Sequence, residues 1–222
     1  MKSCRSTVFA LGACLLAAVV CPAVCLAQAK ENPEAVAGFD AGVAAYQAND
    51  LPLAFKEFLK AATAGHADSQ FNIALMYERG IGVGKDEREA FVWYARSAEQ
   101  GNAAAQFNLG VLYEHGRGTT VDFSKANEWY RKAAVQGDAL AMGNLGMLYL
   151  RGDGVGENKV VGVALLVLSA SRDQSPENHA KQNLAASRGL TAEIIAEAQS
   201  LSNEMGSAPN LLAPLDKYLT TH

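Results

Sequence analysis

Hydrophobic and small residues recur along the chain at the three- and four-residue spacing of one helical face. Between residues 103 and 138 the pattern has two such faces. They carry Ala105, Leu109, Leu112 and Tyr113 in the first, and Ala126, Trp129, Tyr130 and Ala133 in the second. Gly116 and Gly118 predict the end of the first helix, and Asp122 predicts a side-chain cap for the second. The segment is therefore predicted to form a pair of helices.

The same pattern occurs three times at a spacing of 36 residues. Residues 67–102 and 103–138 align without gaps and share 15 identical positions. Residues 139–174 form a third copy, in which the Trp-Tyr pair becomes Leu165-Leu166. Short helices do not bury a face alone, so neighbouring pairs must stack. The sequence predicts an all-α fold, an α-solenoid of about ten helices.

These residues carry a family resemblance. The pattern A-x-x-x-L-G-x-x-Y-x-x-G-x-G, followed by D-x-x-x-A-x-x-W-Y-x-x-A-A-x-Q-G, resembles the Sel1-like repeat, a relative of the tetratricopeptide repeat with a longer, glycine-bearing loop. Residues 30–66 are similar to a shorter, tetratricopeptide-like helix pair without Gly-x-Gly, and residues 175–205 are expected to form capping helices. The resemblance implies a right-handed solenoid of stacked antiparallel helix pairs.

Two segments near the C-terminus depart from the repeat pattern. Residues 160–168 (VVGVALLVL) are apolar on every side, so a helix there must be covered all round. Helices expected at about 177–187 and 191–204 would supply that cover, and an oligomer interface through 160–168 is the alternative. Residues 206–222 are predicted to be a tail whose short amphipathic piece, 211–219, either docks on the array or reaches a partner.

The N-terminus has the pattern of a signal peptide. Lys2 and Arg5 precede an apolar run from Val8 to about Val20, and Ala27-Gln28-Ala29 supplies the small-x-small pattern that signal peptidases cut after. We therefore expect residues 1–29 to be removed after Ala29 and the protein to be periplasmic or secreted. No later stretch reaches 18 apolar residues, so no membrane span is expected after removal of the signal.

The cysteines also lie in this segment. Cys4, Cys14, Cys21 and Cys25 are the only four, so the mature chain would have no disulfide. Leu11-Gly12-Ala13-Cys14 resembles a lipobox, which keeps a lipid-anchored assembly factor as an alternative, although cutting there would leave apolar residues 15–20 on the mature protein. Removing Lys2 and Arg5 from the 19 basic residues, against 23 acidic ones, changes the net charge from −4 to −6.

Charge and motifs exclude several classes of function. There is no basic excess, so no nucleic-acid partner is expected. Residues 80–85 (GIGVGK) resemble a phosphate loop, but Asp86 stands where a hydroxyl residue belongs. The four histidines form no ligand pair, and no nucleophile motif is present, so we expect no metal, no cofactor and no enzymatic activity. The alternative, implied by cysteine-rich Sel1-like relatives, is a cell-wall or β-lactam hydrolase, and the mature chain lacks their cysteines.

Residues on the first helix of each repeat are the candidates for binding. In tetratricopeptide-like arrays the first helices line a concave groove, so the resemblance implies a site on that face. The candidate partner-binding residues are Asn72, Asn108, Asn144, Phe71, Phe107, Glu78, Arg79, Glu114, His115 and Arg151. A row of asparagines, each with a donor and an acceptor, can pair with an extended peptide backbone. The alternative is that each asparagine bonds the backbone of the neighbouring repeat and sets the stacking register.

The aromatic pairs are expected to be structural. Trp93-Tyr94 and Trp129-Tyr130 recur at the repeat period, which is typical of the core between repeats rather than of a ligand platform. The sequence as a whole predicts an exported scaffold or regulator that binds a protein or peptide partner of the cell envelope in its concave face.

Overall fold

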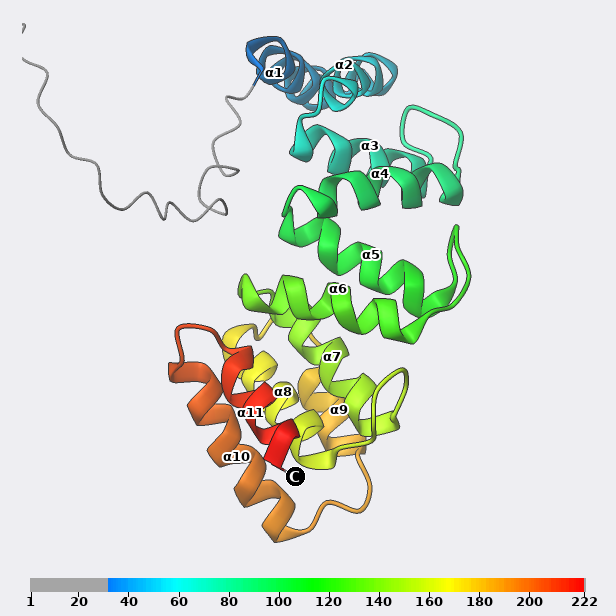
Figure 1. The fold of residues 1–222 in the computed structure, drawn as a ribbon. Coiled ribbons are helices and arrows are strands. Elements are labelled where there is room, and N and C mark those ends of the chain that lie inside the picture. Colours follow the sequence, from blue (N-terminus) through cyan, green and yellow to red (C-terminus); the bar gives the residue numbers. More distant parts are fainter. Residues whose placement is uncertain (1–31, 222) are drawn as a thin grey trace, which may run out of the picture. The chain divides into compact units, whose positions relative to one another are not determined.

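The computed structural model describes residues 32–221, and these form eleven α-helices and no strand (Figure 1). The predicted signal peptide, its cleavage site and the lipobox lie outside the described residues. The helices are α1 (Pro33–Gln47), α2 (Leu51–Thr63), α3 (Ala67–Arg79), α4 (Glu87–Glu99), α5 (Ala103–His115), α6 (Phe123–Val135), α7 (Ala139–Arg151), α8 (Lys159–Arg172), α9 (Ala180–Ala186), α10 (Ala192–Ser207) and α11 (Leu212–Thr221).

Consecutive helices pack in pairs, and the pairs stack. In residues 32–221, α1 packs on α2, α3 on α4, α5 on α6 and α7 on α8. Each pair meets the next through α2 and α3, α4 and α5, and α6 and α7 (Figure 1). This arrangement confirms the predicted α-solenoid, in which each repeat contacts only its neighbours.

Side-chain caps begin the repeat helices at the 36-residue spacing. The caps are His66, Asn102 and Asp138 for the first helices, and Asp86, Asp122 and Asn158 for the second helices. Each accepts a hydrogen bond from a backbone N–H of the first turn, which satisfies a donor that the helix itself leaves free. The first helices end at Gly80, Gly116 and Gly152, each in the left-handed backbone region.

The second glycine of each Gly-x-Gly loop lies against the preceding repeat. A Cβ atom on Gly118 would collide with the carbonyl oxygen of Glu87, the first residue of α4. Gly154 approaches the backbone of Phe123 at the start of α6 in the same way. The loop therefore does more than end a helix, because its glycine permits close contact between repeats.

The repeated tyrosines lie in the core, as predicted. Tyr94 and Tyr130 are fully buried, Trp93 is buried, and Trp129 packs on the same core while partly exposed. Close approach of the aromatic rings depends on first-helix glycines. A Cβ atom on Gly110 would lie 2.6 Å from the Tyr130 ring, and one on Gly42 would lie 2.5 Å from the Phe58 ring.

The apolar segment 160–168 belongs to α8 and is covered by the chain itself. Every residue from Val160 to Leu168 is buried except Val167, which is partly buried. The cover comes from α7 on one side and from α9 and α10 on others. Of the two interpretations of this segment, the structure shows the first, since burial leaves no apolar face there for an oligomer interface.

The predicted tail is folded rather than extended. Gly206 and Ser207 still belong to α10, and α11 packs back on the array with Leu212 and Leu215 buried. Asp216 of α11 forms an ion pair with Arg131 of α6. Of the two possibilities for the amphipathic piece, the structure has the docked one, and α10 runs two residues into the segment that was expected to start the tail at 206.

Candidate functional site

All ten candidate residues lie on the first helices α3, α5 and α7, but their environments differ. Phe71 and Phe107 are partly buried, and their rings lie 5.8 Å from Tyr94 and 6.0 Å from Tyr130. These two phenylalanines therefore contribute to the core of their own repeat as well as to the surface.

Glu78 and Glu114 are held by the buried tyrosines. The Tyr94 hydroxyl donates to Glu78 Oε2 at 2.7 Å, and the Tyr130 hydroxyl donates to Glu114 Oε2 at 2.7 Å. Burial raises the pKa of both tyrosines, and the adjacent carboxylates add to the shift. The two glutamates are only 17% and 14% exposed. They link the two helices of a repeat and have little surface left for a partner.

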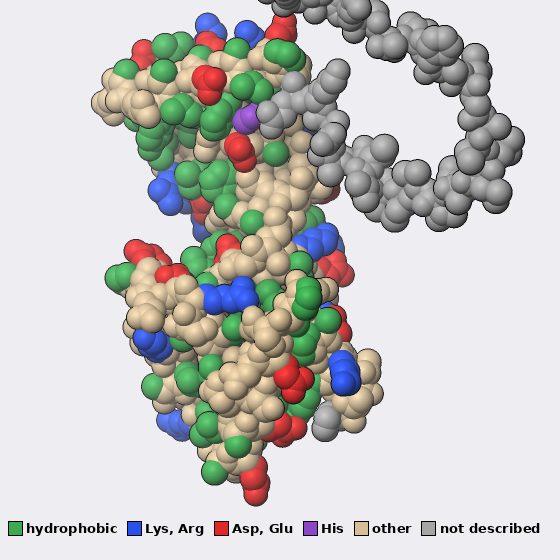
Figure 2. Space-filling model, turned by 90° about the vertical axis from the view of Figure 1, so that its left-hand side faces the viewer, with side chains coloured by type: hydrophobic (Ala, Val, Ile, Leu, Met, Phe, Trp, Pro, Cys, Tyr) green, Lys and Arg blue, Asp and Glu red, His purple; other side chains and the backbone are tan. Residues whose placement is uncertain are grey.

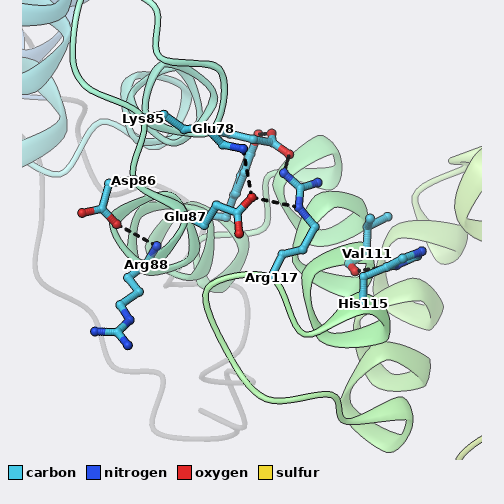
Figure 3. Close-up of polar contacts among 9 residues, drawn as sticks. Glu78, Lys85, Asp86, Glu87, Arg88, Val111, His115 and Arg117 are labelled. Carbon is cyan, nitrogen blue, oxygen red and sulfur yellow. Dashed lines mark hydrogen bonds and ion pairs between the residues drawn. The ribbon is translucent and has the colours of Figure 1, made fainter.

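Arg117 joins two repeats and was not among the candidates. Its guanidinium lies 2.9 Å from Glu78 Oε1 and 3.5 Å from Glu87 Oε1 (Figure 3). Lys85 pairs with Glu87 at 3.1 Å and, with a smaller contribution from Arg117, lowers the pKa of that carboxyl. The sequence does contain a signal for this contact. Arg117 lies between the two loop glycines of its repeat, whereas the equivalent positions of the other two repeats are Ile81 and Asp153.

The candidates at the helix ends, Arg79, His115 and Arg151, are exposed. His115 Nδ1 lies 3.1 Å from the carbonyl oxygen of Val111, one turn back in its own helix, and the ring lies apart from the Arg117 group (Figure 3). Arg151 lies 4.0 Å from Glu114, at the limit of an ion pair. Arg79 makes no ion pair with any residue in the range 32–221. These side chains remain accessible.

The three asparagines do not form a uniform row. Asn144 Nδ2 donates to the Tyr130 hydroxyl of the preceding repeat at 3.1 Å, and Asn108 Nδ2 donates to the Ala104 carbonyl of its own helix at 2.9 Å. Asn72 makes no side-chain hydrogen bond to a described residue. Asn144 thus contacts the neighbouring repeat, but through a side chain and not through the backbone as the structural alternative stated. Of the three asparagines, only Asn72 keeps both its donor and its acceptor free of described residues.

Glutamines link the helices through a polar network that repeats from one copy to the next. Gln70 Nε2 donates to the Ala62 carbonyl at 3.0 Å, and Gln70 Oε1 accepts from Gln100 at 2.6 Å. Gln106 repeats both contacts, with Ala98 and Gln136, at 3.1 and 2.8 Å. The sequence signal was present, since both glutamine positions are shared by the first two repeats.

Asn72 lines a cavity of about 310 Å³ between α1, α2 and α3. Its other lining residues are mainly apolar: Val43, Tyr46, Gln47, Phe58, Leu75, Met76 and Ile81. Tyr46 is 48% exposed at its edge. Figure 2 shows hydrophobic side chains grouped at the top of the view, at the height where Figure 1 places α1 and α2. An apolar cavity that also contains the side-chain amides of Asn72 and Gln47, neither of them bonded to a described residue, is a candidate for a partner site on the first helices.

Residues 32–221 contain no group of three or more His, Cys, Asp or Glu side chains placed to hold a metal ion. Within the same range, none of the helices has the length and apolar character that crossing a bilayer requires.

The stacked helix pairs and their repeated contacts define a helical-repeat protein of the tetratricopeptide-like class. The family model for the Sel1 repeat matches residues 67–102, 103–138 and 139–173. The chain belongs to the Sel1 repeat family. Sel1 repeats generally mediate protein interactions, and proteins built from them are generally non-enzymatic scaffolds.

Two solved structures are similar to this chain. A Sel1 repeat protein from Oxalobacter formigenes is 30% identical over 72% of this chain and 71% of that one, with a TM-score of 0.57. The protein c5321, a protective antigen of uropathogenic Escherichia coli strains with an SLR fold, is 28% identical over 82% of this chain, with a TM-score of 0.49. The match covers 47% of c5321. No curated protein matches the chain.

Proposed function

We propose that this protein is an exported scaffold that binds an extended segment of a partner protein of the cell envelope along its first helices. The observation that carries the proposal is the cavity at Asn72. Its apolar walls suit a hydrophobic side chain of the partner, and the free amide suits the partner's backbone. The hydrolase alternative gains no support from the family model or from the two solved relatives.

The charge near the cavity favours a basic partner segment. Helix α1 carries Glu34 and Asp40 and has no lysine or arginine. Opposite charges on a partner steer its approach and fix its register more than they raise its affinity. The proposed ligand is therefore a hydrophobic side chain flanked by lysine or arginine residues.

Export rests on the N-terminal pattern. An Ala29→Arg variant is expected to block cleavage, because signal peptidases require a small residue at that position. The wild type would then appear in the periplasmic or culture fraction with the molecular mass of residues 30–222. The variant would keep the higher molecular mass of the chain with residues 1–29 still attached. A wild-type protein found uncleaved in the cytoplasm would overturn this part of the proposal.

The binding site is tested by site-specific photo-crosslinking in cells. A photoreactive residue placed at Tyr46 probes the cavity, and one at Val92 probes an exposed position on a second helix of the next repeat. We expect a defined crosslinked partner from position 46 and none from position 92. Adding Asn72→Ala is expected to weaken the crosslink by about tenfold, because it removes a hydrogen bond without altering a core contact.

The outcome is interpreted together with a folding control. The Asn72→Ala variant should retain the helicity and melting temperature of the wild type, since Asn72 bonds no described residue. Equal crosslinking at positions 46 and 92, or a crosslink that Asn72→Ala leaves unchanged, would contradict the proposed site.

A further inference from the structure

A second cavity, of about 340 Å³, lies where α7 ends, α8 begins and α9 covers both. Its polar lining consists of Arg151, Lys159, Asn183, Ser187 and Arg188. No acidic side chain lines it, although the chain has more acidic than basic residues. The cavity therefore collects positive charge in a protein whose net charge is negative.

Most of these polar groups are available to a ligand. Lys159 and Arg188 form no ion pair with any residue between 32 and 221, and Arg151 has only the 4.0 Å contact with Glu114. The side-chain amide of Asn183 makes no hydrogen bond to a described residue. Two cations, Lys159 and Arg188, and one amide thus converge without an acidic partner, beside Arg151 with its single contact at 4.0 Å, which is the arrangement an anionic group would stabilise.

The charge of this cavity is not a general property of the repeat. Lys159 occupies the position of Glu87 and Phe123 in the two earlier copies. Glu87 is negative and pairs with Arg117 and Lys85. Only the third copy places a cation at the start of its second helix beside a cation at the end of its first.

A glycine keeps room for one of the cations. Gly189 has a φ of 69°, a backbone conformation that favours glycine, and a Cβ atom there would lie 3.2 Å from Lys159 Nζ. The turn at Gly189 therefore lets Arg188 approach the cavity while the Lys159 ammonium stays in place.

The remaining walls are apolar. Met147 and Leu150 of α7 and Ala186 of α9 line the same space. A free inorganic anion would gain nothing from these walls, whereas an apolar side chain next to a carboxylate would use both halves of the lining. Both cavities are lined in part by the first helix of a repeat, this one by α7 and the cavity at Asn72 by α3.

We propose that this cavity binds the C-terminal carboxylate of the partner segment, with an apolar last side chain against Met147 and Leu150. The inference rests on the proposed function, since it names the end of the segment that the first helices bind. The planar guanidinium of Arg188 suits the two carboxylate oxygens, and the Lys159 ammonium and the Asn183 amide supply further donors.

The test uses the purified protein and three probes: acetyl-Gly-Ala-Leu with a free carboxylate, the same peptide as its C-terminal amide, and inorganic phosphate. Binding is measured by NMR titration. We expect the free acid to bind at least about tenfold more tightly than the amide, since hydrogen bonds to a charged group are lost in the amide. Arg188→Gln and Lys159→Gln should each weaken binding of the acid by about tenfold.

A matched control is Lys181→Gln, which removes an exposed cation of α9 that does not line the cavity. Its affinity for the free acid should equal that of the wild type. Equal binding of acid and amide, tighter binding of phosphate than of the peptide, or an equal loss in Lys181→Gln would overturn the inference. Unchanged binding in both cavity variants would overturn it as well.

The experiment separates this inference from the proposed function. Arg188→Gln should keep the far-UV circular dichroism of the wild type, because Arg188 is exposed and bonds no described residue through its side chain. A crosslink at Tyr46 that persists in a protein without carboxylate preference would refute the carboxylate site alone. If the protein with an unaltered second cavity formed no crosslink at position 46, the scaffold proposal itself would be refuted.

Discussion

Buried polar side chains in this protein are replaced in pairs from one repeat to the next. Tyr94 with Glu78 and Tyr130 with Glu114 form the same hydrogen bond, and the third copy has Leu166 and Leu150 at these positions. The glutamine pairs behave alike, since the third copy has Met142 and Arg172 instead. A buried donor left without its acceptor destabilises the fold, so one member of a pair does not change alone.

Tyr130→Phe tests the cost of breaking one pair. The variant keeps the ring but leaves Glu114 and Asn144 without the hydroxyl that both contact. We expect the free energy of unfolding to fall by about 1 to 3 kcal/mol, as measured by urea denaturation. The control is Tyr113→Phe, because the Tyr113 hydroxyl bonds no described residue, and a change within about 0.5 kcal/mol is expected there. Equal losses would contradict this role.

The same tyrosines predict the alkaline behaviour of the protein. Burial raises the pKa of Tyr94 and Tyr130 above the usual value of about 10 for an unfolded chain. The folded state then binds the phenol proton more tightly, so this contribution is complete below about pH 10 and is lost as the pH rises beyond it. Urea unfolding between about pH 8 and about pH 11 should show falling stability, with a smaller fall in Tyr130→Phe. A flat profile would contradict the prediction.

At the scale of elements, the Gly-x-Gly loop sets the contact between neighbouring repeats. Gly82, Gly118 and Gly154 each approach the backbone of the first residue of the preceding second helix. These three contacts recur at the repeat spacing, so the loop and the helix that it touches are fixed in register.

Gly118→Ala is expected to break this register. A side chain there would meet the Glu87 carbonyl and would require a φ of +69°, so we expect a loss of about 2 to 4 kcal/mol in thermal or urea unfolding. Gly84→Ala is the matched control in the neighbouring loop, because its Cβ would enter open space without left-handed strain. That variant should be neutral or slightly stabilising. Comparable losses of stability in Gly118→Ala and Gly84→Ala would contradict the prediction, because they would show that the loops tolerate a side chain at neither position.

The helices and their caps could be predicted because they depend on local spacing. Asp86, Asp122 and Asn158 each cap their own helix, and this contact does not depend on which other helix packs nearby. The candidate site could not be predicted as well, because a side chain's partner depends on what lies opposite. Asn108 and Asn144 occupy equivalent positions, yet one bonds its own helix and the other bonds Tyr130. For the same reason, the short amphipathic segment in the C-terminal region did not reveal that it would pack on α10 and that its Asp216 would pair with Arg131 of α6.

At the scale of the whole described chain, the C-terminal helices close the array. Met205, Leu212 and Leu215 belong to the same buried cluster as the residues of α7 and α8. Arg131 of α6 also contacts Asp216 of α11 and lies 3.5 Å from the Tyr149 hydroxyl. The last helices thus replace the neighbour that a further repeat would have supplied.

Leu215→Ala tests this closure. The side chain is fully buried, so its truncation should lower the free energy of unfolding by about 2 to 5 kcal/mol in urea denaturation. Leu219→Ala, on the exposed side of the same helix, should change it by less than about 0.5 kcal/mol. If Leu215→Ala were as mild as Leu219→Ala, α11 would be a loosely attached tail and not a cap.

The pairwise polar contacts have a consequence for how such an array grows. Residues 67–102 and 103–138 contact the repeat before them in the same way, because Gln70 donates to the Ala62 carbonyl and Gln106 donates to the Ala98 carbonyl. A copy of this kind therefore offers a neighbour of its own kind the same interface that it receives. The third copy has Met142 and Arg172 at the glutamine positions and Leu166 and Leu150 at the tyrosine and glutamate positions, and it shares a buried cluster with α10 and α11. Duplication of either of the first two copies would therefore lengthen the row of first helices without changing the contacts at either end, and the third copy, covered by α10 and α11, would keep its place at the end of the array.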